Sequence, residues 1–226
     1  MINILMSRGN LSEANFYQVL KPIIKNKYSV VIVCLSYFPF QFNSKEEYQA
    51  FYSKGGEYYE KMINAFLPYG IKEDAIDFIL EDDKTAIKKI QAADIIYLPG
   101  GAPELFMERI KALGIKTELE NKNKIFIGSS AGAMIQFKNY HISKDNEYQK
   151  FSYNEGLDLL NGFHIEVHYN RKRVQKSGMK KVFRDYRLPI YVIPDDGLIV
   201  VDNNKINLYF TAKQIYNKKG VVKMKT

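Results

Sequence analysis

The chain has 226 residues, of which 46% are hydrophobic and 26% are charged. This composition excludes a disordered protein, and the length is enough for one sizeable core. The single cysteine, Cys34, excludes a disulfide framework and a multi-cysteine zinc site. No apolar run approaches the roughly 18 residues that a membrane-spanning helix needs, and the first residues do not form a signal peptide. We therefore expect a cytoplasmic protein with no membrane partner.

The chain is basic, with 33 Lys and Arg against 25 Asp and Glu, a formal net charge of +8. Much of the excess lies in residues 168–187, where eight basic side chains accompany the single acid Asp185. Such a segment is usually a solvated face, and no nucleic-acid-binding motif accompanies it. We therefore expect no nucleic-acid partner.

The first half of the chain alternates between apolar β-rich runs and segments with helical spacing. The predicted strands are Ile2–Met6, Val30–Leu35, Ile76–Leu80, Ile95–Leu98 and Lys124–Gly128. The predicted helices are Ser12–Lys25, capped by Ser12, then Lys45–Leu67, Lys84–Ala92, and Pro103–Leu113, with Pro103 in its first turn. Nearly continuous apolar strands are typical of a mostly parallel open sheet with helices on both faces, so the pattern predicts an α/β fold.

After residue 160 the pattern changes to short strands, predicted over Phe163–Tyr169, Ile190–Pro194, Leu198–Val201 and Ile206–Phe210. A turn over residues 202–205 joins the last two. No linker or repeat marks a boundary, so we predict a single domain over residues 1–226.

Two smaller features also predict structure. The aromatic side chains of residues 48–59 have helical spacing, which favours core packing over a stacking platform, and Gly55-Gly56 predicts a break in that helix. Cys34 lies in an apolar strand and is expected to be a buried small hydrophobe.

The most informative stretch is Gly128-Ser129-Ser130-Ala131-Gly132, which follows an apolar strand and precedes an expected helix over Ala133–Phe137. This is the G-x-S-x-G spacing of a nucleophile elbow. The small residues permit a tight turn that projects the Ser130 hydroxyl at the carboxyl end of the sheet. There the free N–H of Ala131 can stabilise a developing oxyanion. A plain strand-to-helix turn is the alternative interpretation.

A serine nucleophile needs a base, and the chain has three histidines. His141 follows the elbow helix, whereas His164 and His168 share a predicted strand with Glu166 between them. Because His168 ends that strand at a sheet edge, it is the favoured base.

Further groups fit the same crevice. Gly100 and Gly101 end another apolar strand, so either backbone N–H could complete an oxyanion hole. An acid should orient the histidine, and Asp145 and Glu147, in the polar loop after the elbow helix, are the near candidates.

These motifs resemble the peptidase E and cyanophycinase family of serine peptidases. The resemblance covers most of the chain, from Ile95 to Gly197, and is most specific over Gly128–Met134. It implies a three-layer α/β domain related to class I glutamine amidotransferases, with serine in place of their elbow cysteine.

The resemblance also implies roles for individual residues. Ser130 would be the nucleophile, His168 the general base and Asp145 the third member, with Glu147 as its alternative. Gly101 and Ala131 would supply the oxyanion-hole amides. Peptidase E selects an N-terminal aspartate, which needs a cation. Candidates for that cation stand in the basic segment: Arg171, Arg173 and Arg184.

The leading hypothesis is thus a cofactor-independent serine peptidase without a metal, a monomer or homodimer acting on short peptides, Asp-X dipeptides among them. The family usually has Asn-Thr after its glycines, and Ala102-Pro103 stand there in this chain. This departure keeps open a non-catalytic peptide-binding module of the same fold. A metal-dependent hydrolase using His164, Glu166 and His168 is a further alternative.

Overall fold

The computed structural model describes residues 1–222. A seven-stranded sheet has the order β11-β10-β1-β5-β4-β2-β3. The last five strands of this order run parallel to one another. These five strands are β1 (Ile2–Met6), β2 (Val30–Val33), β3 (Ile76–Ile79), β4 (Ile95–Leu98) and β5 (Ile125–Ser129). The five apolar strands predicted from the sequence are therefore present and parallel.

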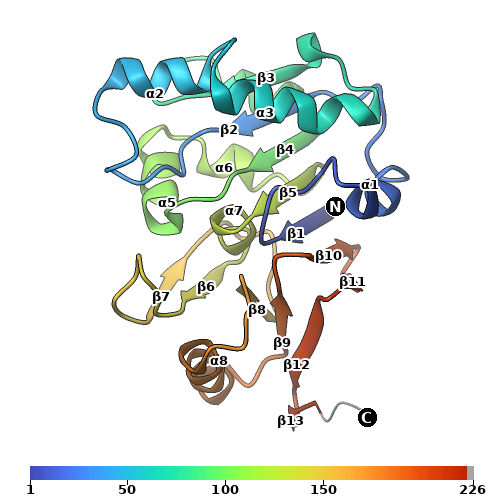
Figure 1. Cartoon of the computed structure of the whole chain (residues 1–226), viewed down its shortest axis with the longest axis vertical. Coiled ribbons are helices and arrows are strands. Elements are labelled where there is room, and N and C mark those ends of the chain that lie inside the picture. The colour runs from blue at the N-terminus through green and yellow to red at the C-terminus, as the bar shows by residue number, and fades with distance from the viewer. Residues whose placement is uncertain (223–226) are drawn as a thin grey trace.

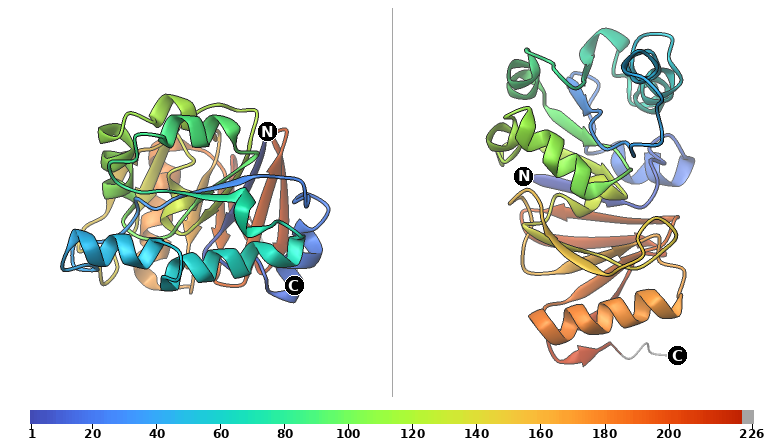
Figure 2. Two further views of the ribbon diagram at one scale, coloured as in Figure 1. Left: turned by 90° about the horizontal axis from the view of Figure 1, so that it is seen from above. Right: turned by 90° about the vertical axis from the view of Figure 1, so that its left-hand side faces the viewer.

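Helices cover both faces of this sheet, as Figures 1 and 2 show. The helices on one face are α1 (Ala14–Leu20), α2 (Lys45–Tyr52) and α3 (Glu57–Phe66), and those on the other are α4 (Ala86–Ala92), α5 (Pro103–Ala112), α6 (Lys116–Leu119) and α7 (Ala131–Met134). Short 3-10 helices follow α3, at Leu67–Tyr69 and Glu73–Ala75. Alternate strand residues enter the two cores: Leu5 packs on one side and Ile4 on the other. The predicted three-layer α/β fold is confirmed.

Several helix bounds differ from the prediction. Ser12 does not cap α1, which begins two residues later without a side-chain cap. The break at Gly55-Gly56 is confirmed, because α2 and α3 are separate helices. Gly55 has a φ of +84°, a conformation that disfavours other residues.

The interpretation of residues 48–59 as core packing is also confirmed. Tyr48 and Tyr52 are buried, and the remaining aromatic side chains of the segment pack against the same core. Cys34 is likewise buried and free, as predicted.

The rest of the chain forms two smaller sheets and extends the large one. The hairpin predicted after residue 197 is confirmed as β10 (Gly197–Asp202) and β11 (Lys205–Phe210), which pair antiparallel beside β1. A four-stranded sheet has the order β13-β12-β9-β8, and β6 pairs with β7. Their bounds are β6 (Asn139–Ile142), β7 (Ser152–Glu155), β8 (His164–Val167), β9 (Ile190–Ile193), β12 (Lys213–Asn217) and β13 (Gly220–Val221).

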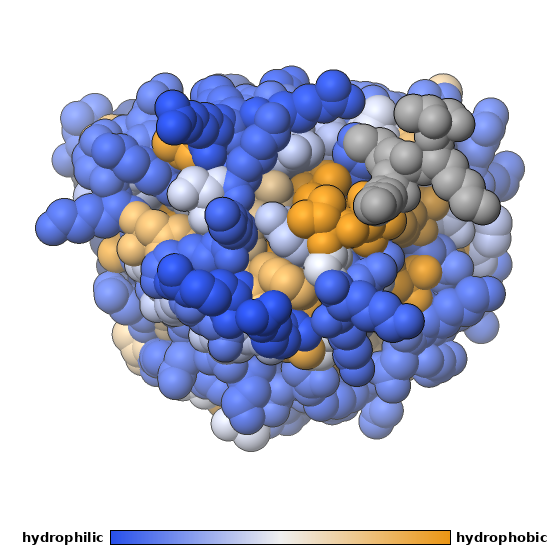
Figure 3. All heavy atoms as spheres, turned by 90° about the horizontal axis from the view of Figure 1, so that it is seen from below, coloured by the Kyte–Doolittle hydropathy of each residue, from blue (hydrophilic) through white to orange (hydrophobic). Residues whose placement is uncertain are grey.

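The basic segment forms a helix that the sequence analysis did not predict, α8 (Arg173–Tyr186). Its buried side chains include Met179, Val182 and Phe183, which pack on the four-stranded sheet. Most cations of this helix are exposed, whereas Lys181 is half-buried over the rings of Phe151 and Tyr153. Figure 3 views this end of the molecule, where hydrophilic side chains cover most of the surface and hydrophobic ones gather in a smaller area between them. The spacing of the three apolar residues was the available signal for a helix.

No helix within residues 1–222 is long and apolar enough to cross a membrane. The single domain over residues 1–226 stays a prediction, and its last four residues lie outside the described range.

Candidate active site

Ser130 directly follows β5, the central strand of the seven-stranded sheet. Its backbone has φ +49° and ψ −113°, an unusual conformation for a residue with a side chain, and its N–H donates to the Met6 carbonyl at 2.9 Å. Glycine is required two residues on, because a Cβ on Gly132 would lie 1.8 Å from the Leu98 carbonyl oxygen. The turn is therefore the strained strand-to-helix elbow that the sequence predicts, although α7 ends at Met134, earlier than expected.

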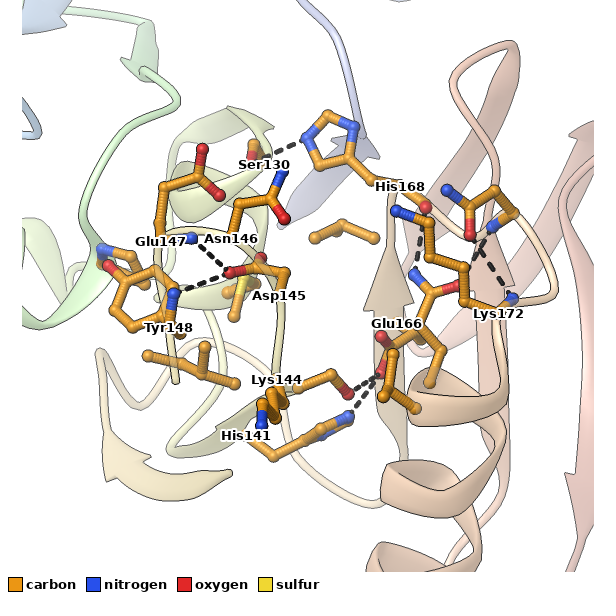
Figure 4. Close-up of a pocket in the computed structure, with 18 of the residues that line it drawn as sticks. Ser130, His141, Lys144, Asp145, Asn146, Glu147, Tyr148, Glu166, His168 and Lys172 are labelled. Carbon is orange, nitrogen blue, oxygen red and sulfur yellow. Dashed lines mark hydrogen bonds and ion pairs between the residues drawn. The ribbon is translucent and has the colours of Figure 1, made fainter. Parts of the chain in front are cut away.

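His168 directly follows β8 and also has a positive φ, +49°. Its Nε2 lies 3.0 Å from the Ser130 Oγ, and its Nδ1 lies 2.7 Å from Asp195 Oδ1 (Figure 4 shows the serine contact). The backbone of His168 is held on both sides: its N–H donates to Ser7 Oγ at 2.8 Å, and its carbonyl accepts from Gln175 Nε2 at 3.0 Å. The histidine is thus fixed between a hydroxyl and a carboxylate.

Asp195 follows β9, the parallel neighbour of β8, so both residues stand at the same sheet edge. Its second oxygen, Oδ2, pairs with Arg8 Nη2 at 2.6 Å. Partial burial raises the pKa of Asp195, but the hydrogen bond and charge of His168 and the charge of Arg8 outweigh it and hold the pKa below its usual value. The carboxylate is therefore ionised and able to accept a hydrogen bond from His168.

Asp145 lies elsewhere, which differs from the expectation that it orients the histidine. Its Oδ1 accepts the backbone N–H groups of Glu147 at 3.0 Å and Tyr148 at 2.7 Å, closing its own loop between β6 and β7. Glu147 lines the cavity beside Ser130, but the acid bonded to the His168 ring is Asp195. An aspartate in a loop commonly accepts hydrogen bonds from the backbone N–H groups two and three residues later in the chain, and Asp145 does so.

The loop after β4 approaches Ser130 from the side. Gly101 has a φ of +145°, and a Cβ there would lie 1.9 Å from the Ser36 carbonyl oxygen. Ser36 fixes this loop, since its Oγ donates to the Gly100 carbonyl and its carbonyl accepts from the Ala102 N–H, both at 2.6 Å. Within residues 1–222, no backbone hydrogen bond uses the N–H of Gly101 or Ala131 as donor. Neither N–H is therefore taken up by a backbone carbonyl in these bonds.

A cavity of about 390 Å³ opens beside Ser130 and His168. The polypeptide segments around it are the 141–148 loop, β8 and the start of α8, and Figure 4 shows its polar side chains. Two lysines, Lys144 and Lys172, line it. A cavity of this size accommodates a few amino-acid side chains rather than a folded protein segment.

Residues 4–209 match the pattern of peptidase family S51. The chain belongs to peptidase family S51. The predicted resemblance to the peptidase E family is thereby confirmed, and membership of S51 supports a serine peptidase that acts on peptides.

Two solved structures have the same fold as this S51 chain. One is a "putative peptidase E protein" from Listeria monocytogenes EGD-e, with a TM-score of 0.63, 20% identity, and coverage of 92% of this chain and 97% of that one. The other is a peptidase from an acI-B1 Actinobacterium, with a TM-score of 0.61, 14% identity, and coverage of 96% and 94%. No curated protein matches the chain.

The three arginines expected to bind substrate in this S51 chain lie away from the cavity lining. Arg184 pairs with the neighbouring Asp185 at 3.0 Å, and Arg171 lines a separate cavity. Arg173 begins α8 and is exposed. Arg173 and Arg184 are exposed because the apolar face of α8 packs on the sheet, whereas Arg171 precedes the helix.

The residues of the metal alternative do not converge. His168 contacts Ser130 and Asp195, whereas Glu166 contacts His141 at 2.8 Å. His168 lies beyond the end of β8 and has a positive φ, so it does not continue the strand alternation that His164 and Glu166 share. Among residues 1–222, no group of three or more His, Cys, Asp and Glu side chains could hold a metal ion.

Sequence reasoning missed Asp195 as a member of this site. The available signal was an acid two residues after the apolar strand 190–193, at the edge where parallel strands present functional side chains. Arg8 likewise stands just after an apolar strand, β1, and so belongs to the same kind of position.

His164 should make the S51 fold sensitive to mild acid. Burial, followed by the charge of His141, lowers the pKa of His164 from 6.5 to about 4, and its Nε2 is buried without a partner within residues 1–222. Between these two pH values the unfolded chain binds a proton at His164 that the folded chain does not bind. The free energy of unfolding is therefore undiminished by this group above pH 6.5 and decreases as the pH falls toward 4. This effect amounts to about 2 kcal/mol between pH 7.5 and pH 5.

Urea unfolding of the wild type and His164→Phe across this pH range measures it. The variant should lose most of that acid-side dependence, since phenylalanine keeps the aromatic contact with Tyr186. Asp195 titrates below this window, because its pKa lies under the usual value of 3.8. An equal pH slope in both proteins would contradict the assignment to His164.

Proposed function

We propose that the chain hydrolyses peptide bonds of short peptides, with Ser130 as nucleophile, His168 as general base and Asp195 as the residue that orients the histidine. The observation that carries the proposal is the continuous chain of hydrogen bonds from Ser130 Oγ through His168 to Asp195, beside a cavity. Asp195 takes the role that the sequence suggested for Asp145.

The acylation half of the reaction begins when His168 Nε2 removes the Ser130 hydroxyl proton as Oγ attacks the peptide carbonyl. The carbonyl oxygen becomes an oxyanion, which the N–H groups of Gly101 and Ala131 stabilise. Asp195 keeps the Nδ1 proton of His168 in place and stabilises the imidazolium. The C–N bond then breaks, His168 gives its proton to the leaving amine, and an acyl-enzyme remains.

Water completes the cycle. His168 removes a proton from a water molecule as the water oxygen attacks the acyl carbon. His168 then gives this proton to Ser130 Oγ when the ester bond breaks. The product carboxylate leaves and the resting enzyme is restored. Each proton is carried by His168, so this route requires no further cofactor.

Selectivity for an N-terminal aspartate is not part of the proposal. The arginines that could pair with such a carboxylate lie off the cavity, and its cations are the exposed Lys144 and Lys172. Short peptides of another composition fit the same catalytic arrangement.

The proposal is tested with a fluorophosphonate probe, read by intact mass and peptide mapping. Wild type should gain one adduct, on Ser130, and Ser130→Ala should gain none. Ser129→Ala is the matched control, because Ser129 is buried against Tyr97 and should leave labelling intact. Well-folded wild type without an adduct would refute an activated serine and favour the non-catalytic binding module.

A further inference from the structure

A second polar cluster lies in the cavity and takes no part in the proposed reaction. The Glu166 carboxylate accepts from His141 Nε2 at 2.8 Å and from Ser143 Oγ at 2.9 Å. Glu166 is 5% exposed and His141 3%, and all three residues line the cavity. Glu166 comes from β8, whereas His141 and Ser143 come from β6 and the loop that follows it.

The carboxylate has unused hydrogen-bonding capacity. Both contacts fall on Oε2, and within residues 1–222 no side-chain partner contacts Oε1. Oε1 is accessible from the cavity rather than sealed in the core, and a carboxylate oxygen can accept two hydrogen bonds. A group inside the cavity that donates hydrogen bonds and carries positive charge would satisfy Oε1 best.

The position of Glu166 in the cavity determines how far the positively charged group must lie from the scissile bond. Glu166 stands two residues before His168, a separation of about 7 Å along a strand. Figure 4 shows Ser130 and His168 at one end of the cavity and Glu166 with His141 at the other. The α-ammonium of a residue being cleaved lies only one carbon from its carbonyl, so it stays near Ser130. A lysine or arginine side chain, several carbons long, can extend from the reacting carbonyl toward the Glu166 end of the cavity.

The charges at the cavity mouth do not oppose such a side chain. Lys144 and Lys172 line the cavity together with Asp145 and Glu147, so the formal charges of these four groups cancel. The pKa of His164, behind the cluster, is lowered by burial, which keeps that ring neutral at pH 7. The acid that can meet such a side chain inside the cavity is Glu166, through Oε1, because His141 and Ser143 are bonded to its other oxygen.

We propose that Glu166 binds the ammonium or guanidinium group of a lysine or arginine next to the scissile bond. The substrate class of the site is then short basic peptides. This inference rests on the proposed serine peptidase activity and adds the residue that selects its substrate.

The test measures kcat/KM for four tripeptides Ala-X-Ala, with X as lysine, arginine, norleucine or aspartate, and product masses identify the bond cut. Norleucine is lysine without its ammonium group. Because hydrogen bonds between charged groups are strong, wild type should favour lysine and arginine over norleucine about 10- to 100-fold. Glu166→Gln should bring the lysine-to-norleucine ratio close to one. Glu155→Gln, an exposed acid at the end of β7, should keep the wild-type ratio.

Equal rates on lysine and norleucine, fastest cleavage of the aspartate peptide, or an unchanged ratio in Glu166→Gln would overturn the proposal. The wild-type series alone decides it where Glu166→Gln fails to fold. Fluorophosphonate labelling distinguishes a failure of the proposed peptidase activity from a failure of the proposed role of Glu166. An adduct on Ser130 without a preference for basic peptides refutes only the role of Glu166, whereas no adduct and no hydrolysis refute the peptidase activity itself.

Discussion

Replacing Ser130 with alanine is expected to lower kcat by roughly 10⁴- to 10⁶-fold, because the variant has no nucleophile and retains only binding and the oxyanion amides. His168→Ala should lose activity to a similar extent, since the hydroxyl is unreactive without a base 3.0 Å away. The residues act as a unit, so the double variant should be little worse than either single one.

Steady-state hydrolysis of a peptide substrate, with circular dichroism to verify folding, measures these effects. Ser129→Ala is the control, because it removes a neighbouring hydroxyl that contacts Tyr97 rather than His168. Activity above one tenth of wild type in Ser130→Ala would rule out the mechanism.

The second large effect is expected from Asp195→Asn, with a loss in kcat of about 10³- to 10⁴-fold. An amide cannot stabilise the imidazolium as a carboxylate does, and its NH₂ group favours the wrong histidine tautomer. The substitution also breaks the ion pair with Arg8.

Asp145→Asn is the matched comparison, because the asparagine oxygen can still accept the two amides of the 145–148 loop. It should leave kcat within a few-fold of wild type. The kcat values of both variants on one peptide substrate decide between the two acids. A large loss in Asp145→Asn with little change in Asp195→Asn would reverse their roles.

Local pattern was sufficient for much of the fold. The parallel strands are short apolar runs whose identity depends on their own side chains, and the elbow residues Gly128–Gly132 carry their backbone requirements within five positions. The position of His168 also followed from sequence, because it ends a recognisable strand. In contrast, α8 was missed because its many charges obscured three buried residues at helical spacing.

The sequence by itself determined the α/β class, the strained Ser130 turn, the glycine loop beside it and the place of His168 at the end of a strand. Each of these depends on local steric limits or on a short periodic pattern. Only the tertiary structure decided that Asp195 contacts His168, that Asp145 closes its own loop, and that Glu166 lies in the cavity. These contacts join residues from separate strands and loops, and the distance between them depends on which strands become neighbours, in particular β8 beside β9. Strand order is a property of the whole packed core, and a linear pattern of side chains does not contain it.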